Sequence, residues 1–183
     1  FVRNYLVWEK IVSRTNFGMT LYASNNDCAE PSMAMELRNG CYGATHPNMN
    51  VPEGRLLLAL GEPAYDRRKT VEALAWMRAH RARFAWLTSR RAIEFWLPLP
   101  VVPAYVCYAI WFVTYLSIPG LAWMCWKRER AALLFLAVFL VYPLLYYIVV
   151  SDPRYRVPIL WMSCLAAGYP ALLLPRRWRD YLG

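Results

Sequence analysis

Acidic side chains and histidines are scarce in this chain, and their scarcity excludes several classes of protein. The 183 residues include 12 aspartates and glutamates, 21 lysines and arginines, and 2 histidines. Beyond Leu97 the only acidic residues are Glu129, Asp152 and Asp180. The sequence also has no phosphate-binding loop, nucleophile elbow or dinucleotide fingerprint. The common soluble-enzyme chemistries therefore have no support in the sequence.

The C-terminal part of the chain consists mainly of long apolar runs without charge. One run extends from Ala131 to Val150, which is about the twenty residues that a helix needs to cross a hydrocarbon core. A lysine or arginine at the centre of such a helix costs roughly 2.5 to 3.5 kcal/mol, and none is present. We predict an all-α polytopic membrane protein with about three transmembrane helices, near residues 101–126, 131–150 and 157–174.

The short basic loops predict the orientation of these spans. Positively charged loops stay on the cytoplasmic side. Two predicted spans separate the two basic clusters, so both clusters lie on the same side of the membrane. We therefore expect the C-terminus in the cytoplasm, and the N-terminal segment together with the turn Ser151–Arg156 outside the inner (plasma) membrane. The clusters are Lys127, Arg128 and Arg130, and Arg176, Arg177 and Arg179.

Residues 1–96 are predicted to form a small extracytoplasmic segment, and residues 97–183 the transmembrane part. Up to about Arg68 the segment is rich in turn signals such as Asn39-Gly40 and Pro52-Glu53-Gly54. Apolar spacing then predicts two amphipathic helices. One covers about 70–80, with Val71, Leu74, Ala75 and Met77 on its apolar face; the other covers about 83–96, with Phe84, Leu87, Ile93 and Trp96 apolar and Arg90, Arg91 and Glu94 polar. Two alternatives stay open for this pair: it lies along the membrane interface, or it covers its own domain.

The cysteines outside the apolar runs suggest a disulfide rather than a metal site. Cys28 and Cys41 lie on the predicted outward side, where a disulfide persists in an oxidising compartment. That bond is a hypothesis, because sequence alone does not give the separation of the two residues. Asp27 and His46 add metal-capable atoms, but the paired spacing of a zinc site is missing. No cofactor is identifiable from these residues.

The net charge of +9 raises the question of the partner. The basic residues are scattered over two regions rather than aligned on one soluble face, so we expect membrane lipids and no nucleic acid. Arg154 and Arg156 lie on the outward side against the topology rule, which suggests an anionic ligand. General binding of lipid phosphates, or pairing with Asp152, is the alternative.

Several strings resemble the C-terminal part of bacterial GT-C type membrane glycosyltransferases, the relatives of protein O-mannosyltransferases and lipid A aminoarabinose transferases. The resemblance covers nearly the whole chain, although Thr20 and Ser24 stand where the family pattern has Asn and Gly. The strings are Arg3-Asn4-Tyr5, Asn16 to Asn26, Glu72 to His80 with Arg83-Phe84 and Arg91 to Trp96, and Asp152-Pro153-Arg154-Tyr155-Arg156-Val157-Pro158.

The resemblance implies transfer of a sugar from a polyprenyl-phosphate donor to an acceptor on the extracytoplasmic face. No position matches the family's catalytic acid, so we expect it upstream of Phe1, in a longer protein of which this chain is the inactive C-terminal portion. Catalytic residues, sugar and acceptor stay unknown. Any ligands for a divalent metal would also come from that N-terminal part.

The donor-binding candidates are Arg154, Tyr155 and Arg156, with Arg3 and Asn4 as weaker ones. Arginine holds two phosphate oxygens at once through its planar fork. In the alternative interpretation the turn is purely structural and Arg154 caps carbonyl groups. The alternative function is a non-enzymatic transporter or assembly subunit whose arginine turn binds lipid phosphate.

Overall fold

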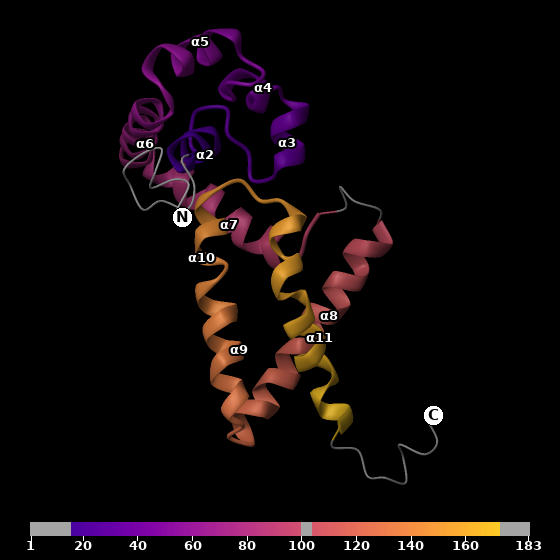
Figure 1. The fold of residues 1–183 in the computed structure, drawn as a ribbon. Helices are drawn as coiled ribbons and strands as arrows, with labels where there is room; N and C mark the ends of the chain where they lie inside the picture. Colours follow the sequence, from indigo (N-terminus) through magenta and orange to yellow (C-terminus); the bar gives the residue numbers. More distant parts are fainter. Residues whose placement is uncertain (1–15, 100–103, 173–183) are drawn as a thin grey trace. The chain divides into compact units, whose positions relative to one another are not determined.

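The computed structural model describes residues 16–99 and 104–172, and all regular structure within these ranges is helical (Figure 1). The chain divides into two compact units. The N-terminal unit contains the described residues up to Arg90 together with Ile148–Val150. The C-terminal unit contains residues 91–147 and the described residues from Ser151 onward. The division lies inside one helix, α7 (Arg81–Trp96), which begins two residues before the predicted helix over 83–96.

The N-terminal unit is more helical than its turn signals predict. Its helices are α2 (Phe17–Ser24), α3 (Met33–Arg38), α4 (Cys41–Thr45), α5 (Val51–Leu60), α6 (Glu62–Ala79) and the first part of α7. Pro52 stands in the first turn of α5, where its missing N–H would have no helical partner. Asn50 caps the same helix, because its side chain accepts a hydrogen bond from Glu53 N. The expected turn at Pro52-Glu53-Gly54 is therefore wrong, and the string begins a helix. The turn at Asn39-Gly40 is confirmed, with Gly40 at φ 78°.

Helices α2 and α6 pack closely along a face that differs from the predicted one. A Cβ on Gly18 would lie 2.1 Å from the Asp66 carbonyl oxygen, so only glycine allows this approach. The buried side of α6 carries Tyr65, Lys69 and Ala73, one turn apart. The prediction that Val71 belongs to the buried face is wrong, since its side chain is 62% exposed. A similar correction applies to α7, where the predicted polar positions Arg91 and Glu94 are buried.

The buried Lys69 is held by carboxylates from two helices. Its Nζ lies 3.0 Å from Glu53 Oε1 and 3.0 Å from Glu72 Oε2, and 4.1 Å from the centre of the Tyr22 ring. Tyr65 Oη donates a 2.7 Å hydrogen bond to the other oxygen of Glu53. Burial opposes the charge of Lys69, but the two glutamates outweigh it and raise the lysine's pKa. Burial likewise opposes the charge of Glu72, whose pKa is nevertheless lowered by its basic partners.

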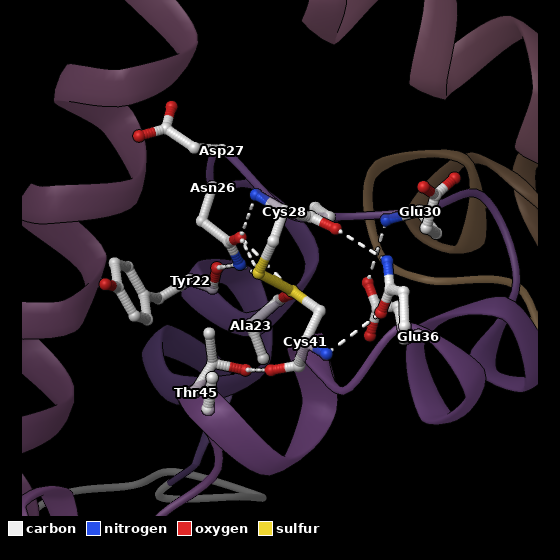
Figure 2. Close-up of a disulfide and its surroundings, with 12 residues drawn as sticks. Tyr22, Ala23, Asn26, Asp27, Cys28, Glu30, Glu36, Cys41 and Thr45 are labelled. Atoms are coloured by element: carbon white, nitrogen blue, oxygen red, sulfur yellow. Dashed lines mark hydrogen bonds between the residues drawn. A yellow bond between two sulfur atoms is a disulfide. The ribbon is translucent and has the colours of Figure 1, made fainter.

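A disulfide joins Cys28, in the loop after α2, to Cys41 at the start of α4, as the sequence suggested (Figure 2). The two Cα atoms are 5.6 Å apart. Asn26 shapes the same loop: its Oδ1 accepts a hydrogen bond from Cys28 N at 3.0 Å, and its Nδ2 donates to the Tyr22 carbonyl at 3.0 Å (Figure 2). The loop is therefore fixed by both covalent and side-chain to backbone bonds.

The C-terminal unit contains two helical segments long and apolar enough to cross a membrane. These are α8 (Ala104–Trp126) and the segment 130–148, which is formed by α9 (Arg130–Val141) and α10 (Leu144–Ile148). Pro143 separates α9 from α10, because it has no N–H for the helical ladder. The short 3-10 helix η1 (Pro153–Tyr155) and the apolar helix α11 (Val157–Leu172) follow. Within the described residues, the first two predicted spans correspond to the two long segments, and the third corresponds to the shorter apolar helix α11.

Helices α8 and α11 contact each other backbone to backbone. A Cβ on Gly120 would lie 1.8 Å from the Ala166 carbonyl oxygen, so the contact requires glycine. Small residues at a helix crossing allow such close approach in membrane proteins. Around the crossing lies the core of the unit, whose buried members are Phe95, Met124, Ala132, Phe135, Phe139, Ile159, Met162 and Ala166.

Candidate functional site

The turn between α10 and α11 is built around Asp152. Its Oδ1 accepts hydrogen bonds from Arg154 N at 2.9 Å and Arg154 Nε at 3.0 Å, and its Oδ2 from Arg154 Nη2 at 2.8 Å. Burial opposes the aspartate's charge, but the bonds and charge of Arg154 outweigh it and lower the pKa of Asp152. The Arg154 side chain is 78% exposed. It is therefore an exposed arginine whose fork is shared with Asp152.

Tyr155 is held by aromatic neighbours. Its ring stacks on Tyr146 with 4.4 Å between the centroids, and its carbonyl accepts a 3.1 Å hydrogen bond from Tyr142 Oη. These two tyrosines belong to the segment immediately before the turn, so Tyr155 joins the end of the turn to that segment. Tyr155 thus fixes the direction in which the next residue enters the unit.

Arg156 points inward and is 1% exposed. Its Nη2 donates to Ser163 Oγ at 2.9 Å and to Thr114 Oγ1 at 3.2 Å. Its guanidinium carbon lies 4.0 Å from the centre of the Trp96 ring. Within the described ranges, neither Nε nor Nη1 has a hydrogen-bond partner, and no carboxylate forms an ion pair with this arginine.

This arrangement leaves a buried cation without a counter-charge in the described part of the chain. Transfer of an unpaired charge out of water is costly, so buried charges in proteins are paired or bind ions. Thr114 already donates its own proton to the Ile110 carbonyl at 2.7 Å and therefore only accepts from Arg156. Two hydroxyl groups and a ring face stabilise the guanidinium, but they do not neutralise it. The unused N–H groups of Nε and Nη1 are suited to a bidentate oxyanion such as phosphate.

An apolar cavity of about 530 Å³ lies beside this arginine in the C-terminal unit. Trp96 and Thr114, both of which contact Arg156, belong to its lining. Apart from Thr114 and Ser117, the lining consists of apolar and aromatic side chains and Cys125: Leu97, Tyr115, Ile118, Leu121, Ala122, Leu136 and Phe139. The cavity therefore offers an apolar volume that ends near a buried positive charge.

The structure describes only some of the other strings on which the family resemblance rests. Arg3 and Asn4 lie outside the described residues. In the Ser24-Asn25-Asn26 loop, Ser24 Oγ accepts a 2.9 Å hydrogen bond from Val150 N, and Asn25 Nδ2 donates a 3.0 Å bond to the Ile148 carbonyl. The loop therefore binds the backbone that leads into the arginine turn.

Sequence reasoning selected Arg156 but missed the residues that hold it. Thr114 and Ser163 are hydroxyl residues in the middle of apolar runs, and that position is the signal that could have singled them out. Trp96 was assigned only to the apolar side of a helix. The three come from α7, α8 and α11, and their convergence depends on tertiary packing, which sequence spacing does not give.

No family model, curated protein or solved structure matches the chain. Within residues 16–99 and 104–172, no group of three or more His, Cys, Asp or Glu side chains is placed to hold a metal ion. The geometry of the arginine turn and its cavity is therefore the basis for a functional assignment.

Proposed function

We propose that this chain is the C-terminal portion of an integral membrane glycosyltransferase. The enzyme moves a sugar from a polyprenyl-phosphate donor to an acceptor on the extracytoplasmic face. The single observation that carries the proposal is Arg156, a buried guanidinium with unused N–H groups that contacts Trp96 and Thr114, two residues lining an apolar cavity. A lipid with an anionic head and a hydrocarbon chain meets both features at once.

Exposed apolar side chains support a membrane location for the C-terminal unit. Phe112 is 65% exposed, Leu133 73% and Leu140 66%, and side chains of this kind in such number are unusual on a soluble surface. The ends of α8 carry the exposed aromatics Tyr105 and Trp126. At 1.5 Å per residue these lie about 31 Å apart, close to the thickness of a hydrocarbon core of about 30 Å. Tyrosine and tryptophan are typical of both membrane interfaces.

In this proposal α8, the α9–α10 segment and α11 cross the inner membrane. The basic loop Lys127–Arg130 then lies in the cytoplasm, and the N-terminal unit and arginine turn lie outside. Arg156 binds the donor phosphate, and the exposed Arg154 guides it from the surface with Tyr155 holding the turn. The phosphate supplies the counter-charge that Arg156 lacks, and stabilisation of the departing lipid phosphate is what transfer requires.

The test compares Arg156 variants in the full-length membrane protein, supplied with a panel of polyprenyl-phosphate sugars. Arg156→Leu removes a charge that has no counter-ion, so we expect unchanged or higher thermal stability together with loss of donor consumption. Arg156→Lys retains the charge without the fork and is expected to keep part of the activity. Arg128→Ala, in the basic loop between α8 and α9, is the matched control.

Two results would overturn the proposal. One is a loss of folded protein in Arg156→Leu that equals its loss of activity, because Arg156 would then have a structural role only. The other is the absence of any donor consumption by the unaltered protein with every lipid-linked sugar in the panel.

A further inference from the structure

A second cavity lies entirely within the N-terminal unit. It has a volume of about 440 Å³ and is formed by the start of α2, the loop after α4, the end of α5 and the first turns of α6. This volume lies within the range of small-molecule sites, about 300 to 1,000 Å³. Its apolar lining consists of Met19, Pro47, Leu57 and Leu58.

His46 contributes a hydrogen-bond donor to this cavity. Its Nδ1 accepts a 3.2 Å hydrogen bond from Asn48 N, and because a backbone amide is always a donor, this nitrogen carries no proton. Burial lowers the pKa of His46, so the ring is neutral at pH 7 and its proton is on Nε2. The ring is fixed by stacking on Tyr42 at 4.7 Å. Nε2–H has no partner in the described residues.

Asp66 contributes an acceptor. Its Oδ1 accepts a 3.1 Å hydrogen bond from Met19 N, which fixes the carboxylate at the start of α6, while Oδ2 has no partner within the described ranges. Asn16 and Asn48 also line the cavity, and their side-chain amides can both donate and accept hydrogen bonds. The lining therefore combines hydrogen-bond donors, acceptors and apolar side chains.

The charges of the lining select the class of ligand. The described lining contains the carboxylates Glu62 and Asp66 but no lysine or arginine, so it disfavours anions. The carboxylates and His46 do not form a metal cluster. A ligand with several uncharged hydroxyl groups and apolar ring faces satisfies both the polar groups and the apolar side chains. We infer that this cavity binds a neutral saccharide.

The saccharide inference rests on the cavity's own chemistry, and its link to catalysis rests on the proposed function. In a transferase that acts on the outer face, a sugar-binding cavity in the N-terminal unit serves the acceptor. The two proposals fail separately, because sugar binding is measured without any lipid donor.

The experiment measures binding of methyl β-glucopyranoside to the purified protein by saturation-transfer NMR, in a detergent without a sugar head group. Asp66→Asn keeps an oxygen for Met19 N but loses the charged acceptor, and we expect affinity to fall about fivefold, or about 1 kcal/mol. Asp27→Asn is the matched control, since Asp27 also keeps one bond, from Trp76 Nε1 at 2.6 Å. A second variant, Leu58→Trp, fills the cavity from a side chain that is 85% exposed and is expected to block binding.

The control for Leu58→Trp is Leu37→Trp, at an exposed position of α3. Loss of binding in both cavity variants, with both controls unchanged, supports the inference. Equal affinities of Asp66→Asn and Asp27→Asn overturn it, as does absence of binding to the unaltered protein. Preference for glucuronate over the neutral glycoside also overturns it, because the acidic lining would repel that sugar.

Discussion

The contact of Gly120 with Ala166 gives the sharpest prediction about the C-terminal unit. In Gly120→Ala the new Cβ would lie 1.8 Å from a carbonyl oxygen, whereas ordinary contacts begin at 3.4 Å. Helices α8 and α11 must therefore separate locally by the difference, about 1.6 Å. The Ala166 carbonyl belongs to the backbone and cannot rotate away as a flexible side chain does. The added methyl group therefore affects all the contacts where α8 and α11 cross.

The expected magnitude follows from two opposing terms. Overpacking costs typically 1 to 3 kcal/mol, and a clash with backbone belongs at about the upper end. Replacement of a helical glycine by alanine returns about 1 kcal/mol of helix propensity. We therefore expect Gly120→Ala to lower the free energy of unfolding by about 2 kcal/mol. In Gly168→Ala only the propensity term remains, because nothing lies within 4 Å of the new Cβ.

The measurement is unfolding of the purified protein in detergent, followed by tryptophan fluorescence. The two alanine variants should differ by about 3 kcal/mol, with Gly168→Ala unchanged or more stable than the parent. Both positions lie in apolar helices of the same unit. Any effect of the detergent on helix propensity is therefore the same in the two variants and cancels in the difference between them. Equal stability of the two variants would refute the close contact between α8 and α11.

Three further predictions concern the N-terminal unit. Replacement of Cys28 and Cys41 by serine should destabilise it by about 3 kcal/mol, the loop-closure value for a bridge with sequence separation 13, measured by thermal unfolding against the parent with its disulfide intact. Lys69→Met removes the buried cation that Glu53 and Glu72 share and should cost about 1 to 3 kcal/mol, whereas Arg68→Ala at the more exposed Arg68–Glu72 pair should cost under about 1; equal losses would contradict the buried network. A pH series of unfolding should show the contribution of Glu72, whose pKa is lowered, disappearing as the pH falls below the ordinary value of 4.5, and that of Lys69, whose pKa is raised, disappearing above 10.5; flat stability through both ranges would count against it.

The parts of the fold that depend on local pattern were predictable from sequence. The apolar runs and the helix before them correspond to α7, α8, α9–α10 and α11, because length and the absence of charge are local properties. The helices of the N-terminal unit were harder to predict, because a proline such as Pro52 is typical both of turns and of helix starts. The distinction depends on the cap from Asn50, which becomes visible only in three dimensions.

The positive charge of the candidate site was predictable from sequence, whereas the residues that surround Arg156 were not. The string around Arg156 carries two arginines on the predicted outward side, so the arginine was noticed. Its burial was not predictable, because Thr114 lies 42 residues away and Ser163 on the following helix. The same limit explains α6, where Lys69 lies one residue before the predicted helix and is held in a buried position by Glu53, 16 residues earlier.

The hydrogen bond between Ser24 and Val150 joins residues separated by 126 positions. During synthesis, the part of the N-terminal unit up to Arg90 leaves the ribosome long before Ile148–Val150, the last three residues of the same unit. Those residues lie at the end of α10 and directly after it, so final closure of the unit must wait until α8, α9 and α10 have been made. A chain stalled after α8 would therefore lack the hydrogen bonds that join Ser24 to Val150 and Asn25 to Ile148.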